Sequence, residues 1–279
     1  MLLELAIGDA YGAGFEYAAN RIVREHNTGQ AYIQHPRHAI APGRYTDDTQ
    51  MSLAIAEAIV DGDAWTPQAL AERFVAAFKR DPREGYASGF HAFLLEVRDG
   101  AEFLARIRPD SDKSGAAMRA PPIGVFASID EVIERATLQA RLTHDTPGGI
   151  ASAVAAALST HYFIHGHGPK SGLAAFIGAH VPGPWDIAWK GKVGAAGMDS
   201  VRAAISAVHA HSSMSELLRA CIAYTGDVDT VATIALAAGA CCPEIEQDLP
   251  ESLYEGLENG AFGHDYVRDL DRRLMACAA

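Results

Sequence analysis

Two short acidic segments, far apart in the sequence, carry the side chains best suited to chemistry. They are RYTDDTQMS (44–52) and TGDVDT (225–230), and each continues into an alanine-rich apolar stretch typical of a helix. A carboxylate at a helix start accepts hydrogen bonds from unpaired backbone N–H groups and opposes the helix dipole. Helix capping therefore explains either segment when it is considered alone.

Together, the two segments hold more negative charge than two helix starts can use. One cap needs one oxygen, whereas each segment contains two carboxylates and at least one hydroxyl. If the helix starts meet, the four carboxylates repel one another and take up protons unless divalent cations neutralise them. Oxygen ligands without nearby Cys or His favour Mg²⁺, Mn²⁺ or Ca²⁺ over Zn²⁺. The spacing itself leaves open whether the segments are neighbours.

The elements that must position these segments are predicted to be helices. Alanine is abundant, strand-like alternation is nearly absent, and apolar residues recur at intervals of three and four. We expect a compact all-α bundle and a single domain over residues 1–279. The clearest predicted helices are 48–61, 66–79, 86–97, 130–142, 148–164, 198–211, 214–224, 228–241 and 262–276.

The composition of the chain disfavours several classes of function and cellular location. The formal net charge of −12 repels phosphate backbones and anionic lipids, which disfavours general nucleic-acid binding. The apolar start of the chain contains Glu4 and is too short for a secretion signal or a membrane span. Four cysteines lack CxxC spacing, as expected for buried thiols in a reducing compartment. We expect a cytoplasmic protein without membrane contact and without a zinc site.

Five sequence blocks resemble the ADP-ribosylglycohydrolase family, which includes the dinitrogenase-reductase-activating glycohydrolases. The resemblance extends from about residue 7 to about residue 240, and the blocks occur in the family's order. They are GDAYGAGFEY (8–17), RYTDDTQM (44–51), SGAAMRAPPIG (114–124), LTHDTPGGIA (142–151) and GDVDT (226–230).

The resemblance implies an orthogonal all-α bundle with a binuclear Mg²⁺ or Mn²⁺ centre. Such an enzyme hydrolyses the bond between ADP-ribose and an acceptor, so an ADP-ribosylated protein or a small ADP-ribosyl compound is the expected substrate. Glu16 and Asp48 are implied to be catalytic, with Glu16 as a general base. The implied metal ligands are Thr46, Asp47, Asp48, Asp227, Asp229 and Thr230.

The segment SDKSGAAMR (111–119) resembles the family's glycine-rich loop around the diphosphate and ribose. The implied substrate-binding residues are Ser111, Ser114, Gly115, Met118 and His144. Two departures from the family's usual pattern stand out. Lys113-Ser114-Gly115 replaces a common Gly-Asn-Gly, and Thr225 occupies a position where many members have glycine.

Two other functions remain open at this stage. One is a catalytically silent ADP-ribose-binding or structural protein, as in lens crystallins that resemble this family. The other is a hydrolase of the same fold that acts on a different ribosyl compound. The sequence does not indicate the acceptor, which could be arginine, serine, another residue, a nucleic-acid end or an O-acyl ester. In the segment 78–90, Asp81, Glu84 and Tyr86 are either residues that face the site or solvated turn residues, and we expect the second.

Overall fold

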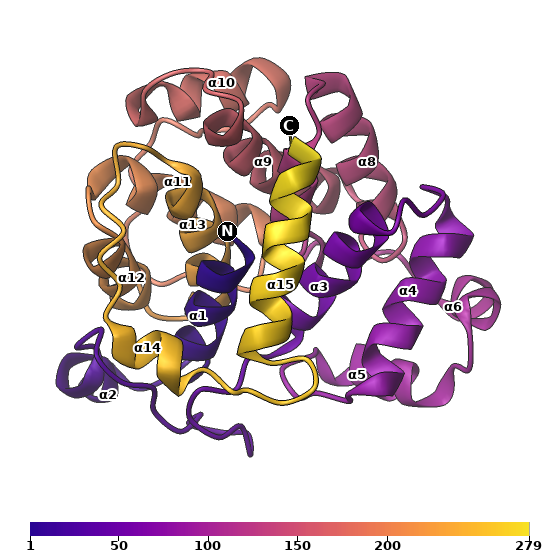
Figure 1. Cartoon of the computed structure of the whole chain (residues 1–279), viewed down its shortest axis with the longest axis horizontal. Helices are drawn as coiled ribbons and strands as arrows, with labels where there is room; N and C mark the ends of the chain where they lie inside the picture. Colours follow the sequence, from indigo (N-terminus) through magenta and orange to yellow (C-terminus); the bar gives the residue numbers. More distant parts are fainter. Residues whose placement is uncertain (279) are drawn as a thin grey trace.

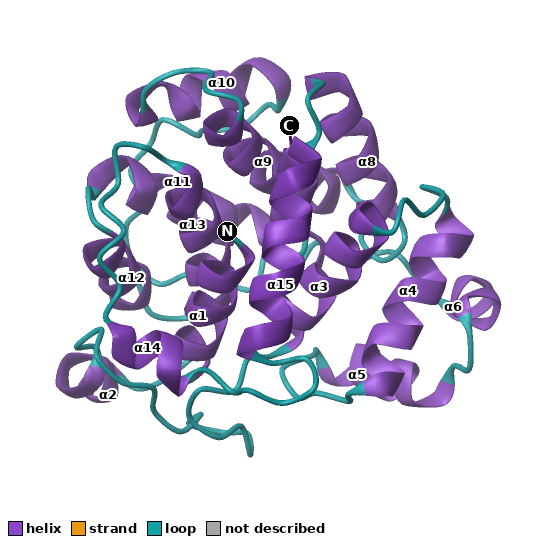
Figure 2. Cartoon of the chain, in the orientation of Figure 1, coloured by secondary structure: helices purple, strands orange, loops and turns teal. Residues whose placement is uncertain are grey.

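The protein is built from helices joined by loops (Figures 1 and 2). The computed structural model describes residues 1–278. Within this range the only β-type pairings are isolated bridges, and no strand forms. The all-α prediction is confirmed. No helix within the described range combines the length and apolar character needed to span a membrane.

The α-helices differ widely in length, from four residues in α7 to 18 in α9. Their bounds are α1 Leu2–Ala13, α2 Asn20–His26, α3 Asp47–Val60, α4 Pro67–Arg80, α5 Ser88–Glu96, α6 Gly100–Arg106, α7 Gly115–Met118, α8 Ile129–Arg141, α9 Pro147–Ile164, α10 Leu173–His180, α11 Gly197–Ala210, α12 Met214–Ala223, α13 Val228–Cys241, α14 Glu251–Gly256 and α15 His264–Met275. Three 3₁₀ turns complete the set: η1 Pro121–Val125, η2 Lys170–Gly172 and η3 Ala276–Ala278.

Each helix predicted from periodicity is present, with ends shifted by at most two residues. The Thr-Pro signals are also confirmed, because the side chains of Thr66 and Thr146 accept hydrogen bonds from the first turns of α4 and α9. Helix α1 and the short helices α2, α6, α7, α10 and α14 were not among the predictions. In α1, Gly8 and Gly12 lower the helix propensity that the pattern depends on.

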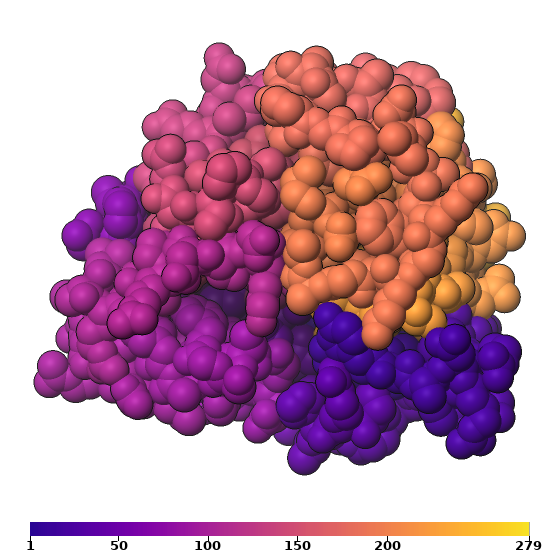
Figure 3. All heavy atoms as spheres, turned by 180° about the vertical axis from the view of Figure 1, so that it is seen from behind, coloured from indigo at the N-terminus to yellow at the C-terminus, as the bar shows by residue number. Residues whose placement is uncertain are grey.

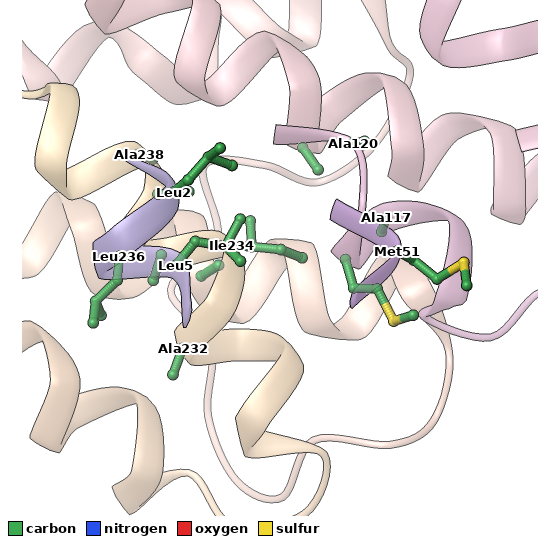
Figure 4. Packing of buried hydrophobic residues seen from close by; sticks show 14 of the residues in the cluster. Leu2, Leu5, Met51, Ala117, Ala120, Ala232, Ile234, Leu236 and Ala238 are labelled. Atoms are coloured by element: carbon green, nitrogen blue, oxygen red, sulfur yellow. The ribbon is translucent and has the colours of Figure 1, made fainter. Parts of the chain in front are cut away.

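Helices α1 and α13 form the centre of the molecule and are buried on almost every side. Their apolar side chains interlock in Figure 4, where Leu2 and Leu5 lie against the α13 residues from Ala232 to Ala238. A Cβ on Gly8 would lie 2.7 Å from the carbonyl oxygen of Ala232. The glycine therefore allows the two helix backbones to touch, which explains why glycine is tolerated inside this helix.

The remaining helices surround this pair. Helix α15 crosses α1 and α3, while α4, α5 and α6 lie to one side and α8, α9 and α10 to another (Figure 1). Helix α7 contacts both α3 and α13, and α3 also contacts α1 and α13. This arrangement brings the starts of α3 and α13 together, although residues 48 and 227 are far apart in the sequence.

Candidate active site

The first turn of α3 is held by a buried carboxylate from α1. Asp9 accepts hydrogen bonds from the backbone N–H groups of Thr46 and Thr49, both at 2.9 Å, and from their hydroxyl groups at 2.7 and 2.6 Å. Thr46 is the N-cap residue, and its oxygen accepts from the N–H of Asp48. Asp9 and Thr46 therefore do the capping, and the side chains of Asp47 and Asp48 are left for another role.

The start of α13 is placed by an unusual backbone turn. Thr225 and Gly226 both have positive φ, 63° and 97°. The carbonyl of Gly226 accepts from the N–H of Tyr17 at 2.8 Å, which ties this turn to the segment after α1. Tyr17 itself has a φ of 48°. A left-handed residue at 225 suits glycine best, so the threonine found here is accommodated with backbone strain.

The predicted residues converge on one cavity of about 640 Å³. The opening lies on the face opposite that of Figure 1, where Figure 3 shows a hollow framed by purple and magenta atoms. The predicted site residues that line it are Glu16, Asp47, Asp48, Ser111, Ser114, Gly115, Met118, His144, Asp227, Asp229 and Thr230. Thr46 is not part of the lining, because its hydroxyl donates to Asp9 instead.

Burial and mutual repulsion make the carboxylates hard to ionise in the absence of a cation. Burial raises the pKa of Asp47, Asp48 and Asp229 well above the usual range, and the nearby carboxylates raise these pKa values further. Burial also raises the pKa of Asp227, to about 6, although hydrogen bonds from Ser114 and Ser200 act in the opposite direction. The carboxyl groups of the cavity therefore tend to keep their protons unless a metal ion replaces them.

The arrangement suits hard divalent cations. Atoms of Glu16, Asp227 and Asp229 that could bind a metal all lie within 4.8 Å of one another. One oxygen each of Asp48 and Asp229 is buried and has no hydrogen-bond partner within the described residues. Buried carboxylate oxygens normally have partners, so these two are available as ligands. With oxygen donors throughout, the set favours Mg²⁺ or Mn²⁺ over Zn²⁺.

Glu16 is oriented by a histidine that sequence analysis did not identify. His35 Nδ1 accepts from the backbone N–H groups of Arg37 and His38, both at 3.0 Å. The ring proton must therefore lie on Nε2, which donates to Glu16 Oε2 at 2.8 Å. The guanidinium of Arg37 lies 3.6 Å from the other oxygen of Glu16. No motif or periodic pattern marks the loop that contains these residues.

The segment 78–90 forms part of the cavity, and the prediction for Tyr86 was wrong. Tyr86 is buried, lines the cavity and donates its hydroxyl proton to Gln50 at 2.7 Å. The prediction is confirmed for Glu84, which is exposed, whereas Asp81 is half-buried in an ion pair with Arg83. Phe90 and Phe93 line the cavity next to Tyr86, so the cavity has an aromatic lining in addition to its carboxylates.

We expect Gly12→Ala to disturb the acidic site although glycine has no side chain to bind a ligand. A Cβ at this position would lie 2.4 Å from Asp229 Cα, and backbone atoms cannot move aside cheaply. We predict a loss of about 1–3 kcal/mol in unfolding free energy, together with weaker Mn²⁺ binding. Urea unfolding and Mn²⁺ titration measure the two effects. The matched control is Gly178→Ala in α10, where the added Cβ meets only an ordinary contact; equal behaviour of both variants would contradict the expectation.

The fold and the cavity together define an all-α protein with a buried, oxygen-rich acidic site. Comparison with known proteins identifies the family to which such a protein belongs. The ADP-ribosylglycohydrolase family model matches residues 1–278. The chain belongs to the ADP-ribosylglycohydrolase family.

Individual relatives are distant and are matched in part. ADP-ribosylhydrolase ARH3 of Xenopus tropicalis is 29% identical over 181 residues, which are 59% of this chain and 49% of that protein. The ADP-ribosyl-[dinitrogen reductase] glycohydrolase of Rhodospirillum rubrum is 27% identical over 180 residues, 61% of this chain and 58% of that protein. The aligned regions thus span about half the length of the curated relatives.

A solved structure shares the fold along the whole chain. The ADP-ribosylglycohydrolase-related protein complex matches with a TM-score of 0.74, at 20% identity, and the match covers 100% of this chain and 96% of that one. At this identity the likeness concerns the fold.

Proposed function

We propose that this protein hydrolyses the bond between ADP-ribose and an acceptor, with Mg²⁺ or Mn²⁺ ions bound in the acidic cavity. The observation that carries the proposal is the convergence of two acidic helix starts on one cavity large enough for a ligand. The relatives named as ADP-ribosyl hydrolases indicate the substrate class. A protein that only binds ADP-ribose would not need this concentration of unpaired carboxylate oxygens.

The residues proposed to hold the ions are those of the two helix starts. Asp47 and Asp48 come from α3, and Asp227, Asp229 and Thr230 come from the start of α13. Four carboxylates are enough for two ions, as expected from the sequence. When bound, such ions supply positive charge that orients hydroxyl groups and makes a water molecule more acidic. Thr46 would keep the first turn of α3 in place.

Glu16 is proposed to accept the proton of the attacking water. Its carboxylate lies within reach of Asp227 and Asp229, and His35 fixes its orientation through the 2.8 Å hydrogen bond. In the reaction, the water oxygen would form a bond to the anomeric carbon of ribose as the bond to the acceptor breaks. The acceptor would leave with the electron pair of that bond and take up a proton, which balances the proton that Glu16 accepts. A general base must lie within hydrogen-bond distance of the proton that it removes, and a fixed carboxylate at the cavity edge meets this requirement.

The loop before α7 is proposed to bind the ADP-ribose. Ser111, Ser114 and Gly115 line the cavity next to Met118 and His144. The loop is held by backbone hydrogen bonds from Ser114 N to Ala195 O, 3.1 Å, and from Gly197 N to Asp112 O, 2.9 Å. Lys113 lines the cavity in place of a family glycine, and it brings a positive charge close to the position proposed for the diphosphate.

Incubation with a panel of ADP-ribosylated compounds tests the proposal. The panel contains ADP-ribosyl-arginine and ADP-ribosyl-serine peptides and an O-acyl-ADP-ribose, each with Mg²⁺, Mn²⁺ or EDTA, and free ADP-ribose is measured. We expect release from at least one compound with metal and none with EDTA. The matched control is Glu84→Gln, which removes an exposed carboxylate outside the cavity lining and should behave like the unmodified protein. Metal-dependent binding of ADP-ribose without release would instead identify a binding protein.

A further inference from the structure

Arg119 is a fully buried cation that has no carboxylate partner among the residues that the structure describes. Its side chain is 1% exposed and lies among the cavity-lining residues, directly after α7. Within residues 1–278 it forms no ion pair with Asp or Glu, even though the cavity is rich in carboxylates. Its guanidinium instead lies 4.4 Å from the ring centre of Phe74. A buried charge of this kind destabilises the fold unless its N–H groups donate hydrogen bonds to well-placed acceptors.

The hydrogen bonds of Arg119 are directed to two residues of the α8 region. Its Nε donates to Gln139 Oε1 at 2.6 Å, and its Nη2 donates to Gln139 O at 3.0 Å and to Thr143 Oγ1 at 2.8 Å. Gln139 Nε2 in turn donates to Ala116 O at 2.9 Å, so the orientation of its amide is determined. Arg119 is always a donor in these bonds, which makes Thr143 Oγ1 an acceptor.

This acceptor role decides how Thr143 interacts with His144. Thr143 Oγ1 lies 2.7 Å from His144 Nδ1 and makes no further side-chain hydrogen bond within the described residues. If His144 donated from Nδ1, the buried hydroxyl proton of Thr143 would have no acceptor, which is costly. The satisfied arrangement is that Thr143 donates to Nδ1. Arg119 strengthens this donation because its charge polarises the hydroxyl.

The opposite nitrogen of His144 faces the cavity beside the proposed ligand loop. With Nδ1 acting as an acceptor, the proton of the neutral ring lies on Nε2. A Cβ added to Gly115 would lie 3.2 Å from this nitrogen, so the glycine keeps this edge of the ring free of a neighbouring side chain. Nε2 makes no hydrogen bond within the described residues and is not among their buried unpaired atoms. Burial, helped by the charges of Arg119 and Lys113, lowers the pKa of His144 to about 3, so the ring stays neutral.

We infer that Arg119 and Thr143 are positioning residues that fix His144 as a neutral hydrogen-bond donor, with Nε2–H directed to an oxygen of the bound ADP-ribose. This inference rests on the proposed function for the identity of the ligand, while the tautomer depends only on the described contacts. The binding role of His144 is part of the proposed function; the inference adds that Arg119 and Thr143 determine which ring nitrogen carries the proton. The buried arginine, which has no carboxylate partner among residues 1–278, thereby acquires a function in ligand recognition.

Nitrogen NMR on the full chain with ¹⁵N-labelled histidine tests the tautomer. We expect His144, assigned by its loss in His144→Asn, to carry its proton on Nε2 at pH 7. In Thr143→Val, the Nδ1 resonance should shift because this nitrogen loses its donor, and Thr143→Ser should restore the original position. A proton on Nδ1 in the unmodified protein would overturn the inference, whether or not ADP-ribose binds.

Calorimetric titration of ADP-ribose in the presence of Mg²⁺ tests the binding role. We expect Thr143→Val to weaken affinity about 3- to 10-fold, as for the loss of one well-placed hydrogen bond, and Thr143→Ser to restore it. The matched control is Thr233→Val, which removes a buried hydroxyl in α13 that has no hydrogen-bond partner among residues 1–278 and should leave affinity unchanged.

Thermal unfolding separates a purely structural role from ligand positioning. A structural role would lower the melting temperature of Thr143→Val but leave the ADP-ribose affinity of the folded protein unchanged, and that result would overturn the inference. Failure of the unmodified protein to bind ADP-ribose would instead contradict the proposed function. The NMR result would still decide the tautomer in that case.

Discussion

Asp48→Asn is expected to abolish hydrolysis and, at the same time, to stabilise the metal-free protein. One carboxylate oxygen of Asp48 is buried without a partner, and the neighbouring carboxylates repel its charge. The amide keeps the shape of the side chain but removes the charge that would attract an ion. We predict a fall in hydrolysis rate of at least about 100- to 1,000-fold, similar to the loss of one key electrostatic contact in an active site.

The stability change has the opposite sign, which makes the prediction specific. Without metal, the charged form of Asp48 is an uncompensated buried charge, so its removal should raise the unfolding free energy by about 1–3 kcal/mol at pH 8. Urea unfolding in EDTA and measurement of released ADP-ribose provide the two numbers. Glu84→Gln, at an exposed position, should change neither. Loss of both activity and stability in Asp48→Asn would indicate damage to the fold and contradict the account.

The metal-free protein is expected to lose stability as the pH rises, and added Mg²⁺ should reverse this trend. A carboxyl group whose pKa is raised in the folded state contributes stability below its unfolded pKa and loses it as the pH rises through its folded pKa. For Asp227 this window runs from its ordinary pKa of 3.8 to a folded-state pKa of about 6. For Asp47, Asp48 and Asp229 it extends further upward.

Metal binding reverses the dependence of stability on pH because metal ions bind the deprotonated carboxylates. The stabilisation by Mg²⁺ should therefore grow from pH 5 to pH 8, and reach about 2.7 kcal/mol when Mg²⁺ is present at 100 times its dissociation constant. Urea unfolding at several pH values, with Mg²⁺ or EDTA, measures the difference. In Asp48→Asn, the stabilisation by Mg²⁺ should depend less on pH. A Mg²⁺ effect of equal size at every pH would contradict the role assigned to these carboxylates.

The regular helices were predictable because their apolar periodicity is strong, and two of them, α4 and α9, also begin with a Thr-Pro cap. Helix α1 was not, because its glycines serve the contact with α13, and that contact involves a partner more than 200 residues away in the sequence. Local propensity is a weak predictor wherever a distant backbone determines which residue fits. The glycines of the block GDAYGAGFEY (8–17), which resembled a family motif, therefore also allow α1 to pack closely against α13.

The acidic site was predictable in its residue types but not in its geometry. Two carboxylates at each helix start indicated surplus charge, yet only the tertiary structure brings Asp48 and Asp227 to one cavity. At α3 the capping role proved to belong to Asp9 and Thr46, and at α13 the N-cap residue Asp227 makes no capping hydrogen bond through its side chain. Buried side chains from other elements, such as His35 and Tyr86, carry no local signal, since a histidine or tyrosine in a loop looks the same in sequence whether it is buried or solvated.

Mn²⁺ binding, counted by electron paramagnetic resonance during hydrolysis, tests the central claim most directly. The signal of free Mn²⁺ disappears on binding, so the bound number can be compared with the release of ADP-ribose in the same sample. We predict two bound Mn²⁺ ions per chain in the unmodified protein, with release of ADP-ribose that rises as they bind. In Asp227→Asn, both binding and release should be largely lost. Undiminished release of ADP-ribose in EDTA, or full activity of Asp227→Asn without bound Mn²⁺, would contradict the account.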